Sequence, residues 1–275
     1  MPVLLQWRQR PSARAAQAKR GLRGLALLSA LLIGLSALAQ PAADTRRSGA
    51  DFMGQSLREM QRDGTLNPGM LWVKQGQSLW DKVDGSLGRS CASCHGEPSS
   101  LRGAAAHFPR WSEALAGPVN LGQQINQCRV QRQGATVLAP ESEGRLALEA
   151  LVAHQSRGLP LAPPTDARLE PFRQGGQAQY RQRIGQLNLS CAQCHDERSG
   201  RSLGGSLIPQ AHPTGYPAYR LEWQTLGSLQ RRLRACYAGV RAEAPPYDAR
   251  ELIELELYLT QSAAGMSIET PAVRP

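Results

Sequence analysis

The chain has 275 residues and a formal net charge of +10. Its length is sufficient for two domains of ordinary small size. The charge does not indicate a nucleic-acid-binding protein, because six of the basic side chains lie in a leader-like segment whose removal leaves about +4. We therefore expect no nucleic-acid partner.

Residues 1–39 have the pattern of a secretory signal peptide. A basic region without acidic residues precedes the apolar run Leu25–Ala39, and Ala37-Leu38-Ala39 satisfies the small-x-small rule for cleavage before Gln40. The basic residues are Arg8, Arg10, Arg14, Lys19, Arg20 and Arg23. The apolar run of about 15 residues is shorter than the ~20 that span a bilayer. We expect cleavage and no membrane span in the mature chain, with a retained anchor as the alternative.

Residues 40–66 are predicted to form an N-terminal extension. Residues 40–50 are small and polar and indicate a disordered tether. Apolar side chains then recur at helical spacing from Ala50 to Arg62, which predicts a short amphipathic helix. We expect this extension to pack across the body of the protein.

Two Cys-x-x-Cys-His pentads, Cys91–His95 and Cys191–His195, are the signature of covalent c-type haem attachment. Two thiols at this spacing can each bond one haem vinyl group, and the adjacent imidazole then reaches the iron. A redox dithiol does not require the histidine, and a zinc ribbon places its cysteine pairs roughly 15–20 residues apart. We predict two covalent haems, attached through Cys91, Cys94, Cys191 and Cys194, with His95 and His195 as iron ligands. Since such haems are added outside the bacterial cytoplasm, we expect a periplasmic protein.

The two pentads belong to an internal repeat with an offset of one hundred residues. Glycines, an aromatic position and a serine before each pentad recur: Gly76/Gly176, Trp80/Tyr180, Gly85/Gly185 and Ser90/Ser190. Strand-like alternation is nearly absent. We therefore predict an all-α fold with two tandem cytochrome c-like domains, 67–158 and 171–275, joined by a stiff proline-rich linker, 159–170.

Each repeat is predicted to end in a helix. In the second copy, Asp248 and Glu251 predict a capping box, and in the first, Glu141 and Glu143 place negative charge in the first turn. Gly158 and Gly265 follow the two helices as stop signals.

The second axial ligand of each iron is not fixed by a motif. Methionine is the common partner of histidine, yet after the first pentad the only methionine is Met266, beyond the last helix. The remaining candidates are His107, His154, His212, Cys128 and Cys236. We favour the cysteines, because one remains in each repeat and both sit on apolar helical faces. Those faces comprise Leu121, Ile125 and Cys128 in the first repeat, and Leu226, Leu229, Leu233 and Cys236 in the second. A buried hydrophobic role and a disulfide remain the alternatives.

The two cysteines differ in the residue four positions earlier, which lies on the same helical face. Arg232 precedes Cys236, whereas Gln124 precedes Cys128. A guanidinium there lowers the pKa of a thiol and can hold a small oxyanion. We therefore expect the second cysteine to be the chemical site and the first haem to be structural or electron-storing.

The sequence resembles the SoxA family, the dihaem subunits of the SoxAX cytochromes of bacterial thiosulfate oxidation. The resemblance covers roughly residues 50–265. Besides both pentads it rests on Asn67-Pro68-Gly69-Met70-Leu71-Trp72-Val73, Tyr216-Pro217-Ala218-Tyr219-Arg220-Leu221, and Leu226-Gly227-Ser228-Leu229-Gln230-Arg231-Arg232 before Cys236.

The resemblance implies an L-cysteine S-thiosulfotransferase. It implies that Cys128 and Cys236 are axial ligands, that Cys236 is catalytic and can carry a persulfide, and that Arg232 binds substrate. The implied partners are SoxX (a monohaem cytochrome), the SoxYZ carrier whose cysteine receives thiosulfate, and a c-type cytochrome that accepts electrons. The alternative is a dihaem electron-transfer protein without sulfur chemistry. A dihaem peroxidase is disfavoured because the sequence has no duplicated distal histidine. A haem sensor is disfavoured because the chain has no room for an output domain.

Overall fold

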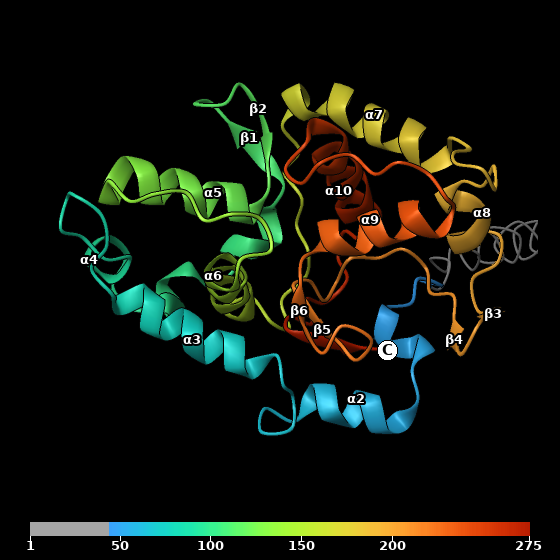
Figure 1. Cartoon of the computed structure of the whole chain (residues 1–275), viewed down its shortest axis with the longest axis horizontal. Coiled ribbons are helices and arrows are strands. Elements are labelled where there is room, and N and C mark those ends of the chain that lie inside the picture. The colour runs from blue at the N-terminus through green and yellow to red at the C-terminus, as the bar shows by residue number, and fades with distance from the viewer. Residues whose placement is uncertain (1–43) are drawn as a thin grey trace, which may run out of the picture. The chain divides into compact units, whose positions relative to one another are not determined.

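The computed structural model describes residues 44–275 (Figure 1). The predicted signal peptide, its cleavage site and residues 40–43 lie outside the described residues. Arg46–Pro275 form one compact unit. Within the described part of the chain, no helix is long and apolar enough to cross a membrane.

Helices dominate this unit. The α-helices are α2 (Gln55–Arg62), α3 (Met70–Asp81), α4 (Ala92–His95), α5 (Leu121–Cys128), α6 (Glu143–His154), α7 (Glu170–Arg181), α8 (Cys191–His195), α9 (Leu229–Gly239) and α10 (Arg250–Ser262). Four 3₁₀ turns are η1 (Gly49–Phe52), η2 (Pro98–Leu101), η3 (Ala104–His107) and η5 (Ala167–Leu169), and the π-helical segment η4 (Arg129–Gln133) continues α5.

Three short sheets accompany the helices, so the all-α prediction is wrong in this respect. Strand β1 (Arg110–Ser112) pairs antiparallel with β2 (Gly117–Val119), and β3 (Ser202–Leu203) pairs antiparallel with β4 (Ser206–Leu207). Strand β5 (Ala218–Arg220) lies between β6 (Thr225–Gly227), which is antiparallel, and β7 (Ala272–Arg274), which is parallel. Strands of two or three residues are too short for alternation to show in a sequence.

The internal repeat has a clear structural counterpart. Helix α3 packs on α6, and α7 packs on α10, as the two groups of helices in Figure 1 show. A Cβ on Gly76 would lie 2.3 Å from the carbonyl oxygen of Ala147, and one on Gly176 would lie 2.1 Å from that of Glu254. Glycine therefore recurs because each helix pair packs backbone against backbone.

The residues around each pentad also match. The Trp80 indole donates to the Gly96 carbonyl at 2.8 Å, and the Tyr180 hydroxyl donates to the Asp196 carboxylate at 2.6 Å. Each ring thus ties a helix to the end of the pentad that follows it. The hydrophobic core around Trp80 includes Cys91 among its partly buried neighbours, and the core around Tyr180 includes Cys191.

The N-terminal extension packs on the body through α2 and β7, as predicted, but in two pieces. The predicted helix from Ala50 to Arg62 is interrupted between η1 and α2, because Gly54 is extended (φ −64°, ψ 161°) and caps α2. From Arg46 onward the chain is not a free tether. The Arg46 guanidinium donates to the carbonyls of Ser262 at 3.1 Å and Ala264 at 2.7 Å.

The proline-rich segment is paired rather than free. The Leu161 amide donates to the Met266 carbonyl at 2.8 Å, and the Gly265 amide donates to the Leu161 carbonyl at 2.7 Å. Helix α7 begins at Glu170, inside the predicted linker. Gly158 (φ 81°) and Gly265 (φ 84°) follow α6 and α10 as expected.

The capping box predicted for the last helix is wrong. Ala249 is the N-cap of α10 and makes no side-chain cap. Asp248 has a φ of 62°, and its carboxylate instead accepts two hydrogen bonds from Arg145, at 2.6 and 2.8 Å. In α6 the cap is Ser142; Glu143 lies in the first turn as predicted.

Candidate functional site

The first pentad opens into a cavity of about 340 Å³ whose lining is mainly apolar. Cys91, Cys94 and His95 line it together with Cys128 at the end of α5. Leu121 and Ile125, the other members of the predicted α5 face, also line it. Asn120 positions this helix through a capping box with Gln123.

The sulfur of Cys128 has a neutral neighbour. The Gln124 side-chain amide lies 3.6 Å from Cys128 Sγ and donates to it, while its oxygen accepts from Arg110 at 2.9 Å. Arg129, which follows the cysteine, is turned to the Asp84 carboxylate at 2.8 Å. Arg110 and Arg129 thus have other partners, and Arg132 also lines this cavity.

The second pentad opens into a larger space. Two adjoining cavities of about 420 and 620 Å³ share His195, Arg232, Leu233 and Cys236 in their linings. Cys191 and Cys194 line the inner one. The outer one reaches Phe52 and Met53 of the N-terminal extension and the arginines of β5 and β7.

His195 and Cys236 face each other in this space. Burial opposes ionisation of the Cys236 thiol, but its hydrogen bond with His195 and the charge of Arg232 outweigh burial, so its pKa is lowered. Burial likewise opposes protonation of His195, yet the same hydrogen bond leaves its pKa raised. The Nδ1 of His195 lies 2.7 Å from the Pro209 carbonyl oxygen, which fixes the ring orientation and leaves Nε2 for the cavity.

Arg232 reaches the cavity one helical turn before Cys236. Helix α9 starts after Ser228, whose hydroxyl accepts from the Arg231 amide at 3.1 Å. Leu226, predicted as part of this helical face, is instead on β6, so the face consists of Leu229, Leu233 and Cys236. The Arg232 side chain is 32% exposed and lies 3.7 Å from Glu222, a contact long enough to yield to an incoming anion.

The residues in each cavity fit a covalently bound haem. Each site brings two thiols and one imidazole to an apolar cavity, and each adds a sulfur from a separate helix, α5 or α9. Thiolate and imidazole are ligands that haem iron accepts in proteins.

Two of the other candidate ligands, His107 and His154, line none of these three cavities. His107 is exposed and its Nδ1 lies 2.7 Å from the Ala162 carbonyl oxygen, while the Nδ1 of His154 lies 3.4 Å from that of Thr270. His212 lines the outer cavity of the second site without lining the inner one. Cys128 and Cys236 are both free thiols, so the disulfide considered as an alternative is not formed.

Comparison with known proteins identifies the family. A model of the SoxA/TsdA cytochrome c domain matches residues 75–161 and 175–268. The chain is 38% identical over 233 residues to the L-cysteine S-thiosulfotransferase subunit SoxA of Pseudaminobacter salicylatoxidans, covering 84% of this chain and 82% of that protein. It is 32% identical to the L-cysteine S-thiosulfotransferase subunit SoxA of Rhodovulum sulfidophilum, and the match covers 84% of this chain and 81% of that protein.

The chain belongs to the SoxA family. A crystal structure of SoxXA from P. pantotrophus superposes with a TM-score of 0.81 and 32% identity, over 84% of this chain and 88% of that one.

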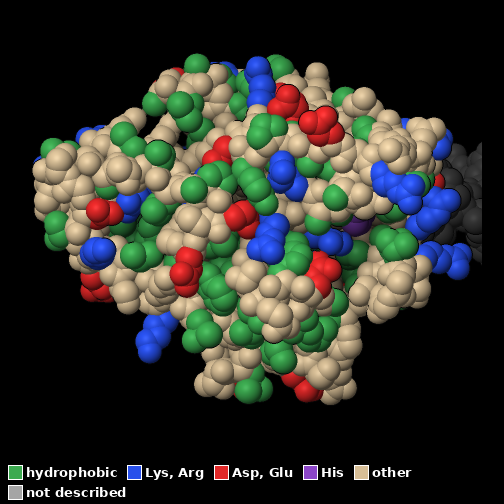
Figure 2. Space-filling view, viewed as in Figure 1, with side chains coloured by type: hydrophobic (Ala, Val, Ile, Leu, Met, Phe, Trp, Pro, Cys, Tyr) green, Lys and Arg blue, Asp and Glu red, His purple; other side chains and the backbone are tan. Residues whose placement is uncertain are grey.

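Two basic residues of this SoxA-family chain escaped the sequence analysis. Arg220 on β5 and Arg274 on β7 line the same cavity as Cys236. Arg220 was visible within the Tyr216–Leu221 motif, but Arg274 is brought in only by the parallel pairing of β7 with β5. Figure 2 shows Lys and Arg side chains on the face over α9, with Asp and Glu side chains interspersed and a histidine among them.

Proposed function

We propose that the chain is the dihaem subunit of a periplasmic L-cysteine S-thiosulfotransferase, which joins thiosulfate oxidatively to a cysteine of the SoxYZ carrier. The observation that carries the proposal is the meeting of His195, Cys236 and Arg232 in one cavity of a SoxA-family chain. SoxX is the proposed partner subunit, in line with the SoxXA complex that the chain resembles.

Residues 67–158 and 171–275 are the proposed haem domains. Cys91 and Cys94 hold the first haem and Cys191 and Cys194 the second, with the axial pairs His95/Cys128 and His195/Cys236. Bound there, haem supplies an acceptor for electrons beside each sulfur.

Arg232 binds thiosulfate and Cys236 reacts with it. The planar guanidinium offers paired donors to sulfonate oxygens. Breaking its contact with Glu222 requires little free energy, because that contact is long and partly exposed. The Cys236 thiolate bonds the outer sulfur of thiosulfate, and the cysteine S-thiosulfonate forms with loss of two electrons. These electrons leave to a c-type cytochrome.

Transfer to the carrier completes the cycle. A carrier cysteine thiolate attacks the sulfur attached to Cys236, a new S–S bond forms, and the Cys236 thiolate leaves. No net electrons move in this exchange. A persulfide on Cys236 is a related resting form, with one extra sulfur atom on the side chain.

The test is thiosulfate-dependent reduction of a c-type cytochrome by the haem-loaded SoxAX complex with SoxYZ. The proposal predicts that reduction of the cytochrome requires thiosulfate, the haem-loaded SoxAX complex and SoxYZ together. Equal rates of cytochrome reduction with and without thiosulfate and carrier would instead identify a plain electron carrier.

A further inference from the structure

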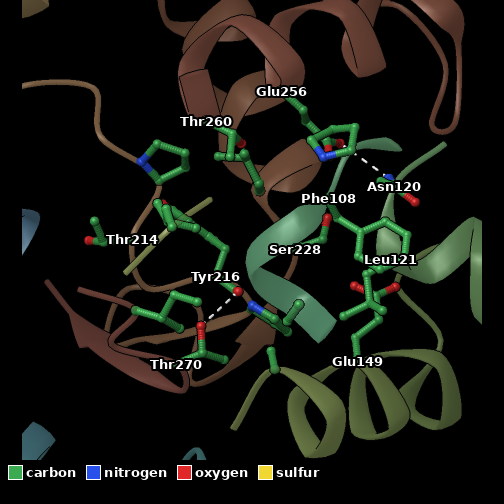
Figure 3. Close-up of a pocket in the computed structure, with 18 residues that line it drawn as sticks. Phe108, Asn120, Leu121, Glu149, Thr214, Tyr216, Ser228, Glu256, Thr260 and Thr270 are labelled. Carbon is green, nitrogen blue, oxygen red and sulfur yellow. Dashed lines mark hydrogen bonds between the residues drawn. The ribbon is translucent and has the colours of Figure 1, made fainter. Parts of the chain in front are cut away.

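A third cavity, of about 110 Å³, lies where α5, α6, α9 and α10 meet (Figure 3). Asn120 and Ser228, the N-caps of the two cysteine-bearing helices, both line it. Phe108 and Leu121 belong to this cavity and to the first haem cavity, whereas Tyr216 and Leu229 belong to it and to the outer cavity of the second site. It therefore lies between the two sites and is part of neither.

Two carboxyl groups enter this cavity from different helices; Glu256 is buried, and the Glu149 side chain is 12% exposed. Figure 3 shows Glu256 of α10 and Glu149 of α6 on opposite sides of the view. The neighbours of Glu149 on its own helix, Leu148 and Val152, line the first haem cavity. Leu255 and Leu259, beside Glu256, line the second. Each carboxyl group thus sits on a helix that also borders one haem cavity.

The charges around the pair do not balance. Arg145 donates to Glu149 at 2.9 Å, but its other two nitrogens are engaged by Asp248. Glu256 has a neutral donor, the Asn120 amide, at 3.3 Å. One guanidinium therefore pairs with two carboxylates, whereas the donors to Glu256 are the neutral side chains of Asn120 and Gln230. Glu141 adds further negative charge near Glu149.

An unbalanced buried cluster of this kind holds a proton. Burial raises the pKa of Glu149 to about 7 despite Arg145, and raises that of Glu256 to about 8 despite its amide donors. Asp248 and the negative charge of Glu149 also raise the pKa of Glu256. The cavity has room for ordered water to carry a proton, since one water needs roughly 10–15 Å³ of such volume.

We propose that Glu149 and Glu256 form a shared proton-binding site that takes up a proton when the flanking haem sites are reduced. Reduction would add one electron to each bound haem, and up to one proton from solvent would neutralise one carboxylate of the pair, with no other bond made or broken. The inference rests on the two covalent haems of the proposed function and not on its sulfur chemistry.

The physical reason is electrostatic. An added electron makes a site more negative, and in a low-dielectric interior that field favours the neutral form of a nearby carboxyl group.

The experiment measures proton uptake when the haem-loaded protein, without thiosulfate or carrier, is reduced electrochemically in weakly buffered solution containing a pH indicator. We expect a fraction of one proton per electron between about pH 7 and 8. Glu256→Gln should lose at least about half of that uptake, and the midpoint potentials should become less dependent on pH. Glu149→Gln should act in the same direction.

Matched controls lie on the same helices. Glu143→Gln on α6 and Glu251→Gln on α10 alter exposed carboxylates in first turns and should leave proton uptake unchanged. The absorption spectrum reports haem loading separately, so a protein that lacks haem contradicts the proposed function instead of this inference. Absence of proton uptake in the haem-loaded wild type, or undiminished uptake in Glu256→Gln, would overturn the inference.

Discussion

The two cavities proposed to hold haem are built alike and differ in what faces the sulfur of Cys128 or Cys236. Trp80 and Tyr180 anchor the pentads from equivalent positions, and each cysteine comes from a helix that starts at a capped loop. The residue four positions before the cysteine differs. The amide of Gln124 donates to Cys128, whereas the hydrogen bond with His195 and the charge of Arg232 together lower the pKa of Cys236 against the effect of burial. The repeat therefore supplies a common scaffold, and the position four residues before the cysteine holds glutamine in one copy and arginine in the other. We propose that this difference makes Cys236 the reactive sulfur.

Removing the sulfur of Cys236 or of Cys128 should give the largest difference in activity between the two sites. We expect Cys236→Ala to abolish thiosulfate-dependent turnover, on the order of 10³-fold or more, because the group that carries the transferred sulfur is lost. Cys128→Ala should retain most of the activity. Steady-state rates, with haem content from the absorption spectrum as the control, check both. Substantial turnover by Cys236→Ala would contradict the assignment.

Making the second site resemble the first should give the next largest effect. Arg232→Gln removes a charged donor to the substrate, which corresponds to a rise of about 10- to 100-fold in the KM for thiosulfate. Gln124→Ala in the first site is the matched control and should leave KM unchanged. Unaltered thiosulfate kinetics in Arg232→Gln would exclude a substrate-binding role for this arginine.

The shared scaffold predicts equal sensitivity at equivalent glycines. Gly76→Ala and Gly176→Ala each force a methyl group against the backbone of the partner helix, so each should lower the free energy of unfolding by about 1–3 kcal/mol. Gly64→Ala, where a Cβ meets no atom within 4 Å, is the control. Thermal unfolding of the haem-loaded protein measures all three. A large cost at one glycine alone would show that the two helix pairs are not equivalent.

The smallest effect on stability is expected at Tyr180, whose hydroxyl takes the place that the indole of Trp80 has in the first repeat. Tyr180→Phe removes the hydroxyl that donates to Asp196 at 2.6 Å, with a cost of about 1 kcal/mol or slightly more. The same unfolding measurement checks it, with Tyr258→Phe on the neighbouring ring as the control. A stability equal to that of the wild type would mean that the second pentad is held by packing alone.

Local patterns in the sequence predicted the parts of the site that local structure decides. The pentads, the repeated glycines and the spacing from Arg232 to Cys236 depend on a few neighbouring residues. Long-range contacts decide the rest. Asp248 was expected to cap α10, but its carboxylate accepts hydrogen bonds from Arg145 instead. Arg274 reaches the cavity because β7 pairs with β5. A single sequence contains no periodicity that reports such contacts.

The most direct test of the central claim is peptide mass spectrometry of the haem-loaded protein after exposure to thiosulfate and an oxidised c-type cytochrome, without carrier. The account predicts added sulfur, as a thiosulfonate or persulfide, on the peptide containing Cys236, and its loss when the carrier is supplied. Added sulfur on Cys128, or full turnover with Cys236 unmodified throughout, would contradict it.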